Sequence, residues 1–493
     1  MIKKKKKFYI TTSIAYTNAP PHCGYALEII QADILARYRR SLGRDVLFLT
    51  GTDEHGAKIA KAAAQAGKSP ATLTDEISAE FRSLKEALNL SNDDFIRTTD
   101  QKKHWPGVKK VWLKLEKNGD IYKKEYEGLY CVGCEAFITE KDLRDGKCII
   151  HQKEPEVIKE ENYFFKLSKY SEKIRTAIEN DKIKIIPQSR KNEVLSFIKQ
   201  GLKDISFSRP RKDLQWGIPV PTDEGQTIYV WADALTNYIS ALGYAKEGSK
   251  FKKFWPADVH CVGKDILRFH AVIWPGILFS LGLKLPKIIF VHGFITVNGQ
   301  KMSKSLGNVV NPFDLVRNYG ADATRYFLMR EISSTTDGDF TYEKFKKRCN
   351  GDLSAGLGNL IARILTLAEK NGINKAVAEP KFQREIDKTW KNYRRNIEDF
   401  KLNEALIVIW DLIGHCDRYI EKEQPWSLEA GDAKLEKILA NLLFTIASLA
   451  EMLRPFLPNT AERMFEQLGI KKLIGKKLLL KVKKGESLFP KIA

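Results

Sequence analysis

The sequence predicts an α/β protein in which a parallel-sheet domain is interrupted by an insertion and followed by an all-α helical bundle. Apolar, β-branched runs alternate with helix-spaced segments up to about residue 115 and again from about residue 226 to 295. The alternation stops between these two parts, and beyond about residue 345 only helical spacing remains. We therefore divide the chain into five segments: 1–115, 116–225, 226–295, 296–345 and 346–493.

A strand, a tight turn and a helix open the chain. The apolar run from Phe8 to Ile14 leads into Pro20-Pro21-His22-Cys23-Gly24-Tyr25, and helix-spaced apolar residues follow. A strand, a turn and a helix in this order begin a Rossmann-like nucleotide-binding unit. In such a unit the first N–H groups of the helix and its dipole favour the binding of phosphate. The turn has neither the GxGxxG nor the P-loop pattern, so it predicts neither a dehydrogenase nor a P-loop enzyme. Taken alone, His22 is more often an ordinary turn histidine.

The run Asp45–Thr50 has the continuous apolar character of a parallel strand that is buried on both faces. It ends at Gly51-Thr52-Asp53, at the edge where open parallel sheets bind ligands. A carboxylate at that place suits an ammonium group. The local pattern fits a cap for the helix that begins near Gly56 almost as well, so both interpretations stay open.

Two metal-ligand pairs lie in the segment 116–225. Cys131-Val132-Gly133-Cys134 is followed, after thirteen residues, by Cys148-Ile149-Ile150-His151. The spacing of each pair suits one knuckle, and together they supply the three thiolates and one imidazole of a closed tetrahedral Zn²⁺ site, which stabilises structure and does not activate water. The alternatives are four unrelated side chains, or a redox CxxC, which the second pair and the missing strand-to-helix context disfavour.

The α/β pattern returns at Thr227–Trp231, which we expect to be a strand leading into a helix. Trp231, Ala234, Leu235 and Tyr238 occupy one face of that helix, and on periodicity alone they are an ordinary core stripe.

Two further apolar runs, Val259–Gly263 and Ile288–Val291, are expected to be parallel strands. The first of these runs ends at Gly263, and Asp265 follows two residues later. A glycine at this edge lets a ligand approach the backbone closely, and a carboxylate suits ribose hydroxyls. The second run ends beside Val297-Asn298-Gly299-Gln300.

Asn298-Gly299 predicts a two-residue hairpin, because both central positions of that turn need φ > 0. Lys301-Met302-Ser303-Lys304-Ser305 follows directly. Two ammonium groups on a mobile hairpin suit a polyphosphate whose charge grows as a bond breaks, although such a cluster alone is usually a solvated basic turn. We expect this hairpin and the His22 turn to flank one crevice.

A helical bundle is predicted beyond residue 345. Asn359 and Arg363, spaced i, i+4, form either a surface hydrogen-bonded pair or a reader of base edges in an unpaired RNA loop. Trp426 offers a ring for base stacking, although a tryptophan near a helix end is more often in the core. Helix-spaced apolar positions recur in four segments: 353–365, 402–423, 434–455 and 460–468.

Composition limits the classes of function. The formal net charge of +21, from 82 Lys+Arg against 61 Asp+Glu, favours a polyanionic partner, although general lysine usage also raises it. The opening lysine run lacks the apolar stretch and cleavage pattern of a secretory signal, and no apolar run is long enough to span a membrane. Seven cysteines, an odd number, argue for the reducing cytoplasm and against a disulfide framework.

The His22-Cys23-Gly24-Tyr25 turn and the distal Lys301–Ser305 motif, in this order and separation, resemble the two signatures of class I aminoacyl-tRNA synthetases. Further matches, over essentially the whole chain, narrow the resemblance to the methionyl-tRNA synthetases in their short bacterial form with one zinc knuckle. They are Gly51-Thr52-Asp53-Glu54-His55-Gly56, Ser208-Arg209-Pro210, Trp216-Gly217-Ile218-Pro219, Tyr229-Val230-Trp231-Ala232-Asp233-Ala234 and Val262-Gly263-Lys264-Asp265-Ile266.

This resemblance implies activation of L-methionine by ATP with Mg²⁺, transfer to the 3′ end of initiator and elongator methionine tRNAs, structural Zn²⁺, and a cytoplasmic monomer. It implies catalytic roles for His22, Tyr25, Lys301 and Lys304, and ATP binding by His22, Gly24, Gly263, Asp265 and Lys304. The implied methionine pocket is Ile14, Tyr16, Asp53, Trp231, Ala234, Leu235, Tyr238, Ile266 and His270. The implied zinc ligands are Cys131, Cys134, Cys148 and His151, and the implied anticodon readers are Asn359, Arg363 and Trp426.

One position departs from the resembling family, which usually has His where this chain has Tyr25. This departure is the only support for one alternative, a catalytically silent RNA-binding paralogue. A second alternative is a synthetase for leucine, isoleucine or valine, but those relatives carry a larger editing insertion than the segment 116–225 provides.

Overall fold

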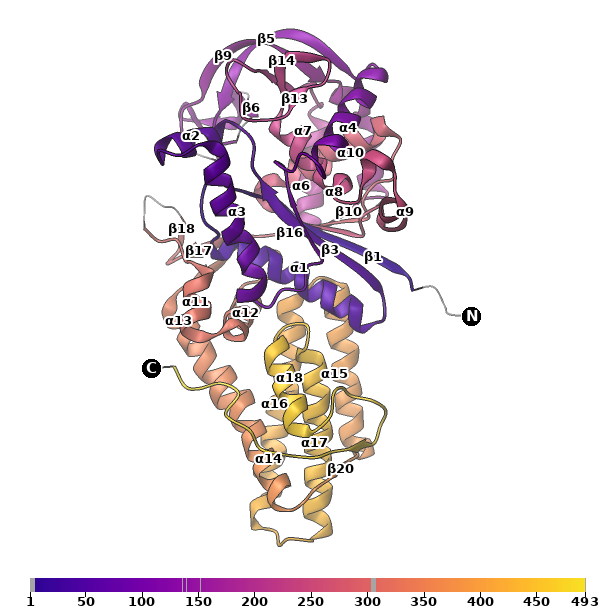
Figure 1. The fold of residues 1–493 in the computed structure, drawn as a ribbon. Coiled ribbons are helices and arrows are strands. Elements are labelled where there is room, and N and C mark those ends of the chain that lie inside the picture. Colours follow the sequence, from indigo (N-terminus) through magenta and orange to yellow (C-terminus); the bar gives the residue numbers. More distant parts are fainter. Residues whose placement is uncertain (1–4, 135, 139, 151, 303–306, 493) are drawn as a thin grey trace. The chain divides into compact units, whose positions relative to one another are not determined.

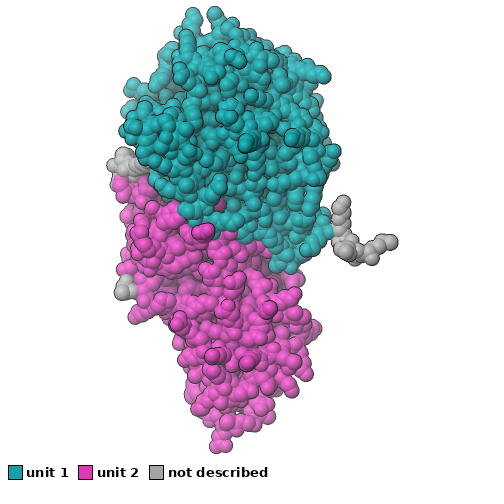
Figure 2. All heavy atoms as spheres, in the orientation of Figure 1, with its two compact units in different colours: residues 1–21, 39–85, 91–292 teal, residues 22–38, 86–90, 293–493 magenta. Residues whose placement is uncertain are grey.

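The computed structural model describes residues 5–134, 136–138, 140–150, 152–302 and 307–492 (Figure 1). His151 and Lys304, two of the predicted site residues, therefore lie outside the described residues. The chain forms two compact units, coloured separately in Figure 2. Unit 1 contains residues 1–21, 39–85 and 91–292, and unit 2 contains residues 22–38, 86–90 and 293–493.

A seven-stranded sheet in which every pair is parallel forms the centre of unit 1, in the order β10-β16-β15-β1-β3-β2 with β4 beside β3. The parallel strands predicted at 45–50, 259–263 and 288–291 are confirmed. Both faces are covered, since residues 47–53 and 259–263 are buried throughout. The strands are β1 (Lys7–Thr12), β2 (Ala15–Tyr16), β3 (Asp45–Asp53), β4 (Asp94–Arg97), β10 (Lys184–Ile186), β15 (Val259–Gly263) and β16 (Ile288–His292).

Helices pack around this sheet in unit 1. Their apolar faces join the sheet in a single core that includes Trp112, Phe165 and Trp274. The helices are α2 (Ala57–Gln65), α3 (Pro70–Ala87), α4 (Trp105–Lys117), α5 (Ser171–Glu179), α6 (Gln188–Lys199), α7 (Val230–Leu235), α8 (Asn237–Ser240), α9 (Ser249–Phe254) and α10 (Trp274–Leu281), with the short turns η2 (Leu167–Tyr170), η3 (Tyr244–Lys246), η4 (Lys264–Ile266) and η5 (Phe269–Ile273).

The segment 116–225 is mostly antiparallel, but one expectation about it is wrong. β10 pairs in parallel with β16, so the α/β pattern does not stop throughout the segment. Three residues, one of them Lys184, were too short an apolar run to predict this strand. The antiparallel strands are β5 (Ile121–Cys131), β6 (Ala136–Ile138), β9 (Glu156–Phe165) and β11 (Ile205–Ser206) in one sheet, β7 (Leu143–Arg144) and β8 (Lys147–Cys148) in a second, with η1 (Glu140–Asp142) between β6 and β7.

The strand predicted at Thr227–Trp231 is displaced. β14 (Asp223–Ile228) pairs antiparallel with β12 (Ser208–Pro210) and β13 (Pro219–Val220) in a separate three-stranded sheet. α7 begins at Val230, so Trp231 lies on a helix and not at the end of a parallel strand. The β-branched and aromatic residues of this run predicted an extended conformation, which tertiary packing overrides.

Unit 2 contains α1 (Cys23–Ser41) up to residue 38 and the predicted hairpin. β17 (Ile295–Val297) and β18 (Gln300–Lys301) are antiparallel, and Asn298 and Gly299 have φ of 51° and 74°. Both central residues therefore have positive φ, as the Asn-Gly pair predicts. β19 (Gly338–Phe340) completes this sheet.

The helical bundle predicted beyond residue 345 is confirmed. One of its helices, α15, was not predicted, because charged side chains separate its buried residues Phe382, Ile386, Tyr393 and Ile397. The helices from residue 312 onward are α11 (Pro312–Tyr319), α12 (Ala321–Arg330), α13 (Tyr342–Arg348), η7 (Cys349–Gly358), α14 (Asn359–Lys370), α15 (Pro380–Glu398), α16 (Leu402–Glu423), η8 (Pro425–Ser427), α17 (Ala433–Leu453) and α18 (Pro458–Leu468), with the short strand pair β20 (Lys375–Ala376) and β21 (Leu478–Leu479).

None of the helices in the described part of the chain combines the length and the apolar content that crossing a membrane requires.

Candidate active site

The His22 turn leads directly into the first turn of α1. The Cys23 N–H donates to the Val310 carbonyl at 3.0 Å, and the Gly24 N–H donates to His22 Nδ1 at 3.0 Å. His22 is exposed, and Tyr25 is buried. A Cβ atom on Gly24 would lie 2.8 Å from His22 Cε1, which is closer than carbon atoms normally approach. Glycine at this position therefore lets the imidazole lie against the start of the helix.

The second basic motif lies beside this turn within unit 2. A Cβ atom on Gly24 would lie 3.6 Å from Met302 Cε, so the two motifs, nearly three hundred residues apart in sequence, are adjacent in space. Lys301 is exposed, and its ammonium lies 5.8 Å from the centre of the Phe294 ring. The Asn308 side-chain amide donates to the Lys301 carbonyl at 3.2 Å. A polyphosphate at this place would meet a histidine, the N-terminus of α1 and at least one lysine.

The carboxyl end of β3 lies beside an aromatic wall in unit 1. Asp53 pairs in register with Tyr16, and its carbonyl accepts the Thr17 N–H at 3.1 Å. The Tyr16 ring meets Trp231 edge-on, with centroids 6.2 Å apart. Gly56, and not Asp53, is the N-cap of α2, so the capping alternative for Asp53 is wrong. The Asp53 side chain is buried at the end of β3, next to this wall.

His270 and Tyr238, two further predicted pocket residues, are hydrogen-bonded to each other. His270 Nδ1 lies 2.9 Å from the Ile266 carbonyl and His270 Nε2 lies 2.7 Å from the Tyr238 hydroxyl. Because a carbonyl only accepts, Nδ1 is the donor, and in the neutral ring Nε2 accepts the hydroxyl proton. The remaining predicted pocket residues pack here: Ala234 and Leu235 are buried, and Ile14 and Ile266 lie partly buried against the same core.

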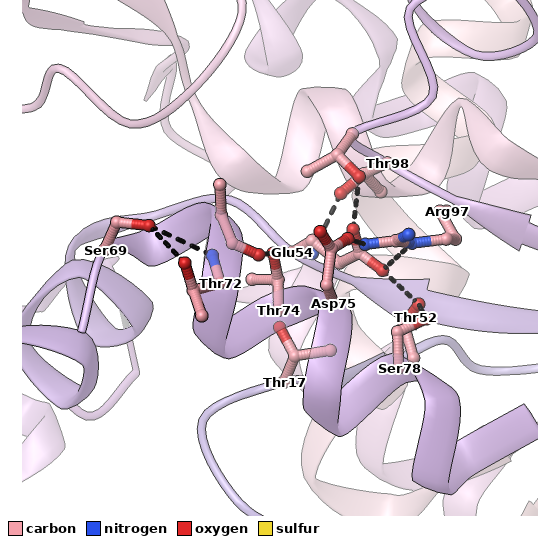
Figure 3. Close-up of polar contacts among 12 residues, drawn as sticks. Thr17, Thr52, Glu54, Ser69, Thr72, Thr74, Asp75, Ser78, Arg97 and Thr98 are labelled. Atoms are coloured by element: carbon pink, nitrogen blue, oxygen red, sulfur yellow. Dashed lines mark hydrogen bonds and ion pairs between the residues drawn. The ribbon is translucent and has the colours of Figure 1, made fainter. Parts of the chain in front are cut away.

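Glu54, the residue after Asp53, is fixed by a charged network that sequence analysis did not predict. Its carboxylate accepts hydrogen bonds from the Thr52 hydroxyl at 2.6 Å, from Arg97 Nε at 2.7 Å and from the Thr99 hydroxyl. Arg97 also pairs with Asp75 at 2.6 Å. Figure 3 shows the guanidinium directed between the two carboxylates. This network fixes the loop immediately after β3.

His55, the next residue, belongs to a second network that was also missed. Its Nδ1 lies 2.7 Å from Asp233 Oδ2, and His104 Nε2 lies 2.6 Å from Asp233 Oδ1. Burial alone would raise the pKa of the Asp233 carboxyl, but the two histidines hold that pKa below its ordinary value. Asp233 is therefore a buried carboxylate ion. Its identity as the fifth residue of Tyr229-Val230-Trp231-Ala232-Asp233 was the only sequence signal for it.

Gly263 ends β15 next to Asp265. A Cβ atom on Gly263 would lie 2.7 Å from Asp265 Oδ1 and 3.7 Å from the His292 ring, so a larger residue would displace the carboxylate. Asp265 is exposed.

Three of the four predicted zinc ligands come together in the insertion. One ligand atom from each of Cys131, Cys134 and Cys148 lies within 4.8 Å of the others, and Cys134 Sγ and Cys148 Sγ are 3.6 Å apart. The Cys134 N–H also points to Cys131 Sγ at 3.4 Å. Three sulfur atoms at this separation suit one tetrahedral Zn²⁺ ion, for which thiolates are the preferred ligands.

The three predicted anticodon readers lie near one another in unit 2. Asn359 and Arg363 are on α14, and the Arg363 guanidinium lies 5.5 Å from the centre of the Trp426 ring. Trp426 is 49% exposed, so the core alternative for this residue is wrong. Arg363 pairs with Glu421 at 2.7 Å. An exposed ring beside a guanidinium is a suitable surface for stacking an unpaired base.

Two family models of tRNA synthetases match this chain, one over its α/β part and one over its C-terminal helical part. Residues 8–142 and 139–365 match the family described as tRNA synthetases class I (M), and residues 381–487 match the family described as anticodon-binding domain of tRNA ligase.

Relatives match over nearly the whole chain. A methionine--tRNA ligase of Caldanaerobacter subterraneus subsp. tengcongensis is 46% identical, with 99% of this chain and 79% of the relative covered. One of Brucella suis is 43% identical, with 94% of this chain and 92% of the relative covered. A structure of Mycobacterium tuberculosis methionyl-tRNA synthetase in complex with methionyl-adenylate superposes with a TM-score of 0.94 at 38% identity, covering 98% of this chain and 100% of that one.

Proposed function

This chain belongs to the class I methionyl-tRNA synthetase family and ligates methionine to tRNA at the expense of ATP, and we propose specific roles for its residues in that reaction. The observation that carries the proposal is that the His22 turn and the Lys301 loop are adjacent, with Met302 Cε 3.6 Å from the place that a Cβ atom on Gly24 would occupy. His22 and Lys304 bind the triphosphate, Lys301 supports them, and the positive end of the α1 dipole contributes.

The chemistry needs little proton transfer. In the first step the methionine carboxylate, already ionised, attacks the α-phosphate of ATP and releases pyrophosphate. The terminal ribose hydroxyl of the tRNA then takes the acyl group and releases AMP. Catalysis consequently rests on positioning and on stabilising the charge that builds on the phosphates. Mg²⁺ bound to the ATP phosphates would neutralise part of that charge.

The methionine site has a charged end and an apolar end. Asp53 binds the α-ammonium, and Gly263 and Asp265 receive the ribose of ATP. Polarisable sulfur packs well against ring edges, so the aromatic wall suits the thioether. We assign to that wall Ile14, Tyr16, Trp231, Ala234, Leu235, Tyr238, Ile266 and His270.

The insertion and the bundle contact the tRNA in this proposal. Cys131, Cys134, Cys148 and His151 hold a structural Zn²⁺ ion, and Asn359, Arg363 and Trp426 read the anticodon of both initiator and elongator methionine tRNAs. We further propose that the protein is a cytoplasmic monomer. Its seven cysteines, all within the described residues, form no disulfide bond, which suits a reducing compartment.

The test is ATP–pyrophosphate exchange with single amino acids. Methionine alone should support exchange, and Lys304→Ala should lower the rate a few hundredfold, about 3 kcal/mol, with methionine affinity unchanged. Lys388→Ala, a substitution of an exposed lysine on α15, is the matched control and should leave the rate unchanged. Exchange driven by leucine, isoleucine or valine, or no exchange at all as in a silent paralogue, would overturn the proposal.

A further inference from the structure

The two residues that follow Asp53 at the end of β3 are each held by buried charged groups. Glu54 is tied to Arg97 and Thr99, and its carbonyl accepts the Trp216 indole N–H at 2.5 Å. His55 is tied to Asp233 at 2.7 Å. Asp53, the last residue of β3, thus directly precedes two residues that cannot shift without breaking a buried charged contact.

The Asp233 network is closed on all sides. Asp233, His55 and His104 are 1%, 3% and 0% exposed. The Asp233 carboxylate only accepts, so His104 Nε2–H donates to it, and in the neutral ring Nδ1, 2.7 Å from the Ser240 hydroxyl, is left as the acceptor. The Trp105 and Trp216 rings flank His55, with centroids 6.0 and 5.7 Å away. One tautomer of each histidine therefore satisfies every contact of the carboxylate.

Asp233 lies on α7, the helix that also carries residues of the proposed methionine pocket. Trp231 and Ala234, on the same helix, belong to the wall assigned to the thioether. His55 lies two residues after Asp53, which is assigned to the ammonium. A single carboxylate consequently links the helix behind the thioether to the loop that meets the ammonium.

We propose that Asp233 is a positioning residue which, through His55, sets the place of the Asp53 carboxylate relative to the thioether wall. A ligand gains from this arrangement only when it has both an ammonium group and a side chain of methionine length. The inference rests on the proposed role of Asp53, and it adds Asp233, His55 and His104 to the residues that determine substrate recognition.

Asp233→Asn is the informative substitution because it keeps the volume and one acceptor while removing the charge. One histidine must then change tautomer or lose its partner. We expect the KM for methionine to rise about 10- to 100-fold, as when residues that orient a site are changed, with the KM for ATP unchanged. Inhibition by 4-(methylthio)butanoate, which has the thioether but no ammonium, should stay as in the wild type. Equal weakening of methionine and 4-(methylthio)butanoate, or an unchanged KM for methionine, would overturn the proposal.

A second pair of variants tests the same contact if Asp233→Asn does not fold. His55→Asn keeps an N–H donor at the place of Nδ1, and His55→Leu removes it. We expect the asparagine variant to bind methionine nearly as the wild type does and the leucine variant to show the raised KM. Equal KM values for the two variants would overturn the proposal.

Two controls separate the possible failures. Asp120→Asn changes an equally buried carboxylate of unit 1, which accepts the Tyr170 and Ser280 hydroxyls at 2.5 Å each, and should leave the KM for methionine unchanged. Asp53→Asn should raise the KM for methionine without affecting 4-(methylthio)butanoate. If Asp53→Asn leaves the KM for methionine unchanged, the proposed role of Asp53 fails. If Asp53→Asn raises this KM and Asp233→Asn does not, only the present inference fails.

Discussion

At the scale of one residue, Gly24 lies where the two candidate catalytic motifs are adjacent. The space that a Cβ atom would fill lies against the His22 ring on one side and the Met302 methyl group on the other. Tyr25, the next residue, is buried in α1 where the family usually has a histidine. The family's histidine can carry a positive charge near neutral pH and a phenol cannot, so a phosphate contact by Tyr25 would be that of a neutral donor.

Tyr25→His should leave the pyrophosphate-exchange rate equal or higher, because it restores the donor that the family uses. Tyr25→Phe, which removes the hydroxyl and keeps the ring, is the matched variant and should lower the rate if the phenol contacts phosphate. A collapse of activity in Tyr25→His at unchanged thermal stability would show that the pocket has adapted around the phenol.

At the scale of structural elements, the insertion (residues 116–225) contains a small core of its own. Cys131, Ile138 and Cys148 are buried together, and β5 and β9 lead to and from this cluster. Such a core is too small to be stable by apolar burial alone, so bound metal should provide most of its stability.

Atomic absorption should therefore find about one zinc ion per purified chain. Cys148→Ser should lose the zinc, and limited proteolysis should then cut the segment between β5 and β9 first. Cys416→Ser replaces a buried cysteine outside the cluster and should keep both the metal and the resistance to protease. Metal-free wild-type protein with an intact segment would contradict the zinc assignment.

β15 carries a buried histidine that should make stability depend on pH. Burial and the neighbouring His270 lower the pKa of His260 well below its ordinary value of 6.5, and Thr11 Oγ1 lies 2.7 Å from its Nδ1. Below pH 6.5 the unfolded chain binds a proton at this imidazole that the folded chain does not bind. The contribution of neutral His260 to the free energy of unfolding is therefore complete above pH 6.5, and it is lost progressively as the pH falls below 6.5.

Urea unfolding between pH 5 and 7 should show this effect as a difference between two proteins. His260→Asn keeps a polar group beside Thr11 and does not titrate. The free energy of unfolding of the wild type should fall by about 1.4 kcal/mol per pH unit more than that of the variant below the ordinary histidine pKa. Parallel curves for the two proteins would contradict a buried neutral His260.

At the scale of the whole molecule, the chain carries a net charge of +21 and therefore suits a polyanion such as tRNA. The candidate anticodon readers lie in unit 2, whereas the candidate methionine pocket lies in unit 1. Activation of methionine without tRNA should consequently not depend on the anticodon readers.

Trp426→Ala should lower kcat/KM for tRNA charging roughly 5- to 150-fold, which corresponds to about 1–3 kcal/mol, with pyrophosphate exchange unchanged. Trp390→Ala is a close control in the same bundle, because Arg394 lies 5.1 Å from that ring much as Arg363 lies 5.5 Å from Trp426. Equal effects of the two substitutions on charging would contradict a specific role for Trp426.

Much of this architecture follows from local pattern. Continuous apolar runs predicted three buried parallel strands, and Asn298-Gly299 predicted the hairpin before Lys301. Where the pattern was short or interrupted by charge, prediction failed. β10 has three residues and α15 has charged residues between its buried ones, so neither gave a run that could be recognised.

The sequence by itself determined the Asn298-Gly299 turn, the period of the long apolar elements and the residue types at the candidate site, because these depend on neighbours along the chain. Only the tertiary structure decided which distant groups meet. Asp233 is separated from His55 by 178 positions and from His104 by 129. No local spacing encodes such a contact, because it forms only when the sheet and its helices close around the buried carboxylate.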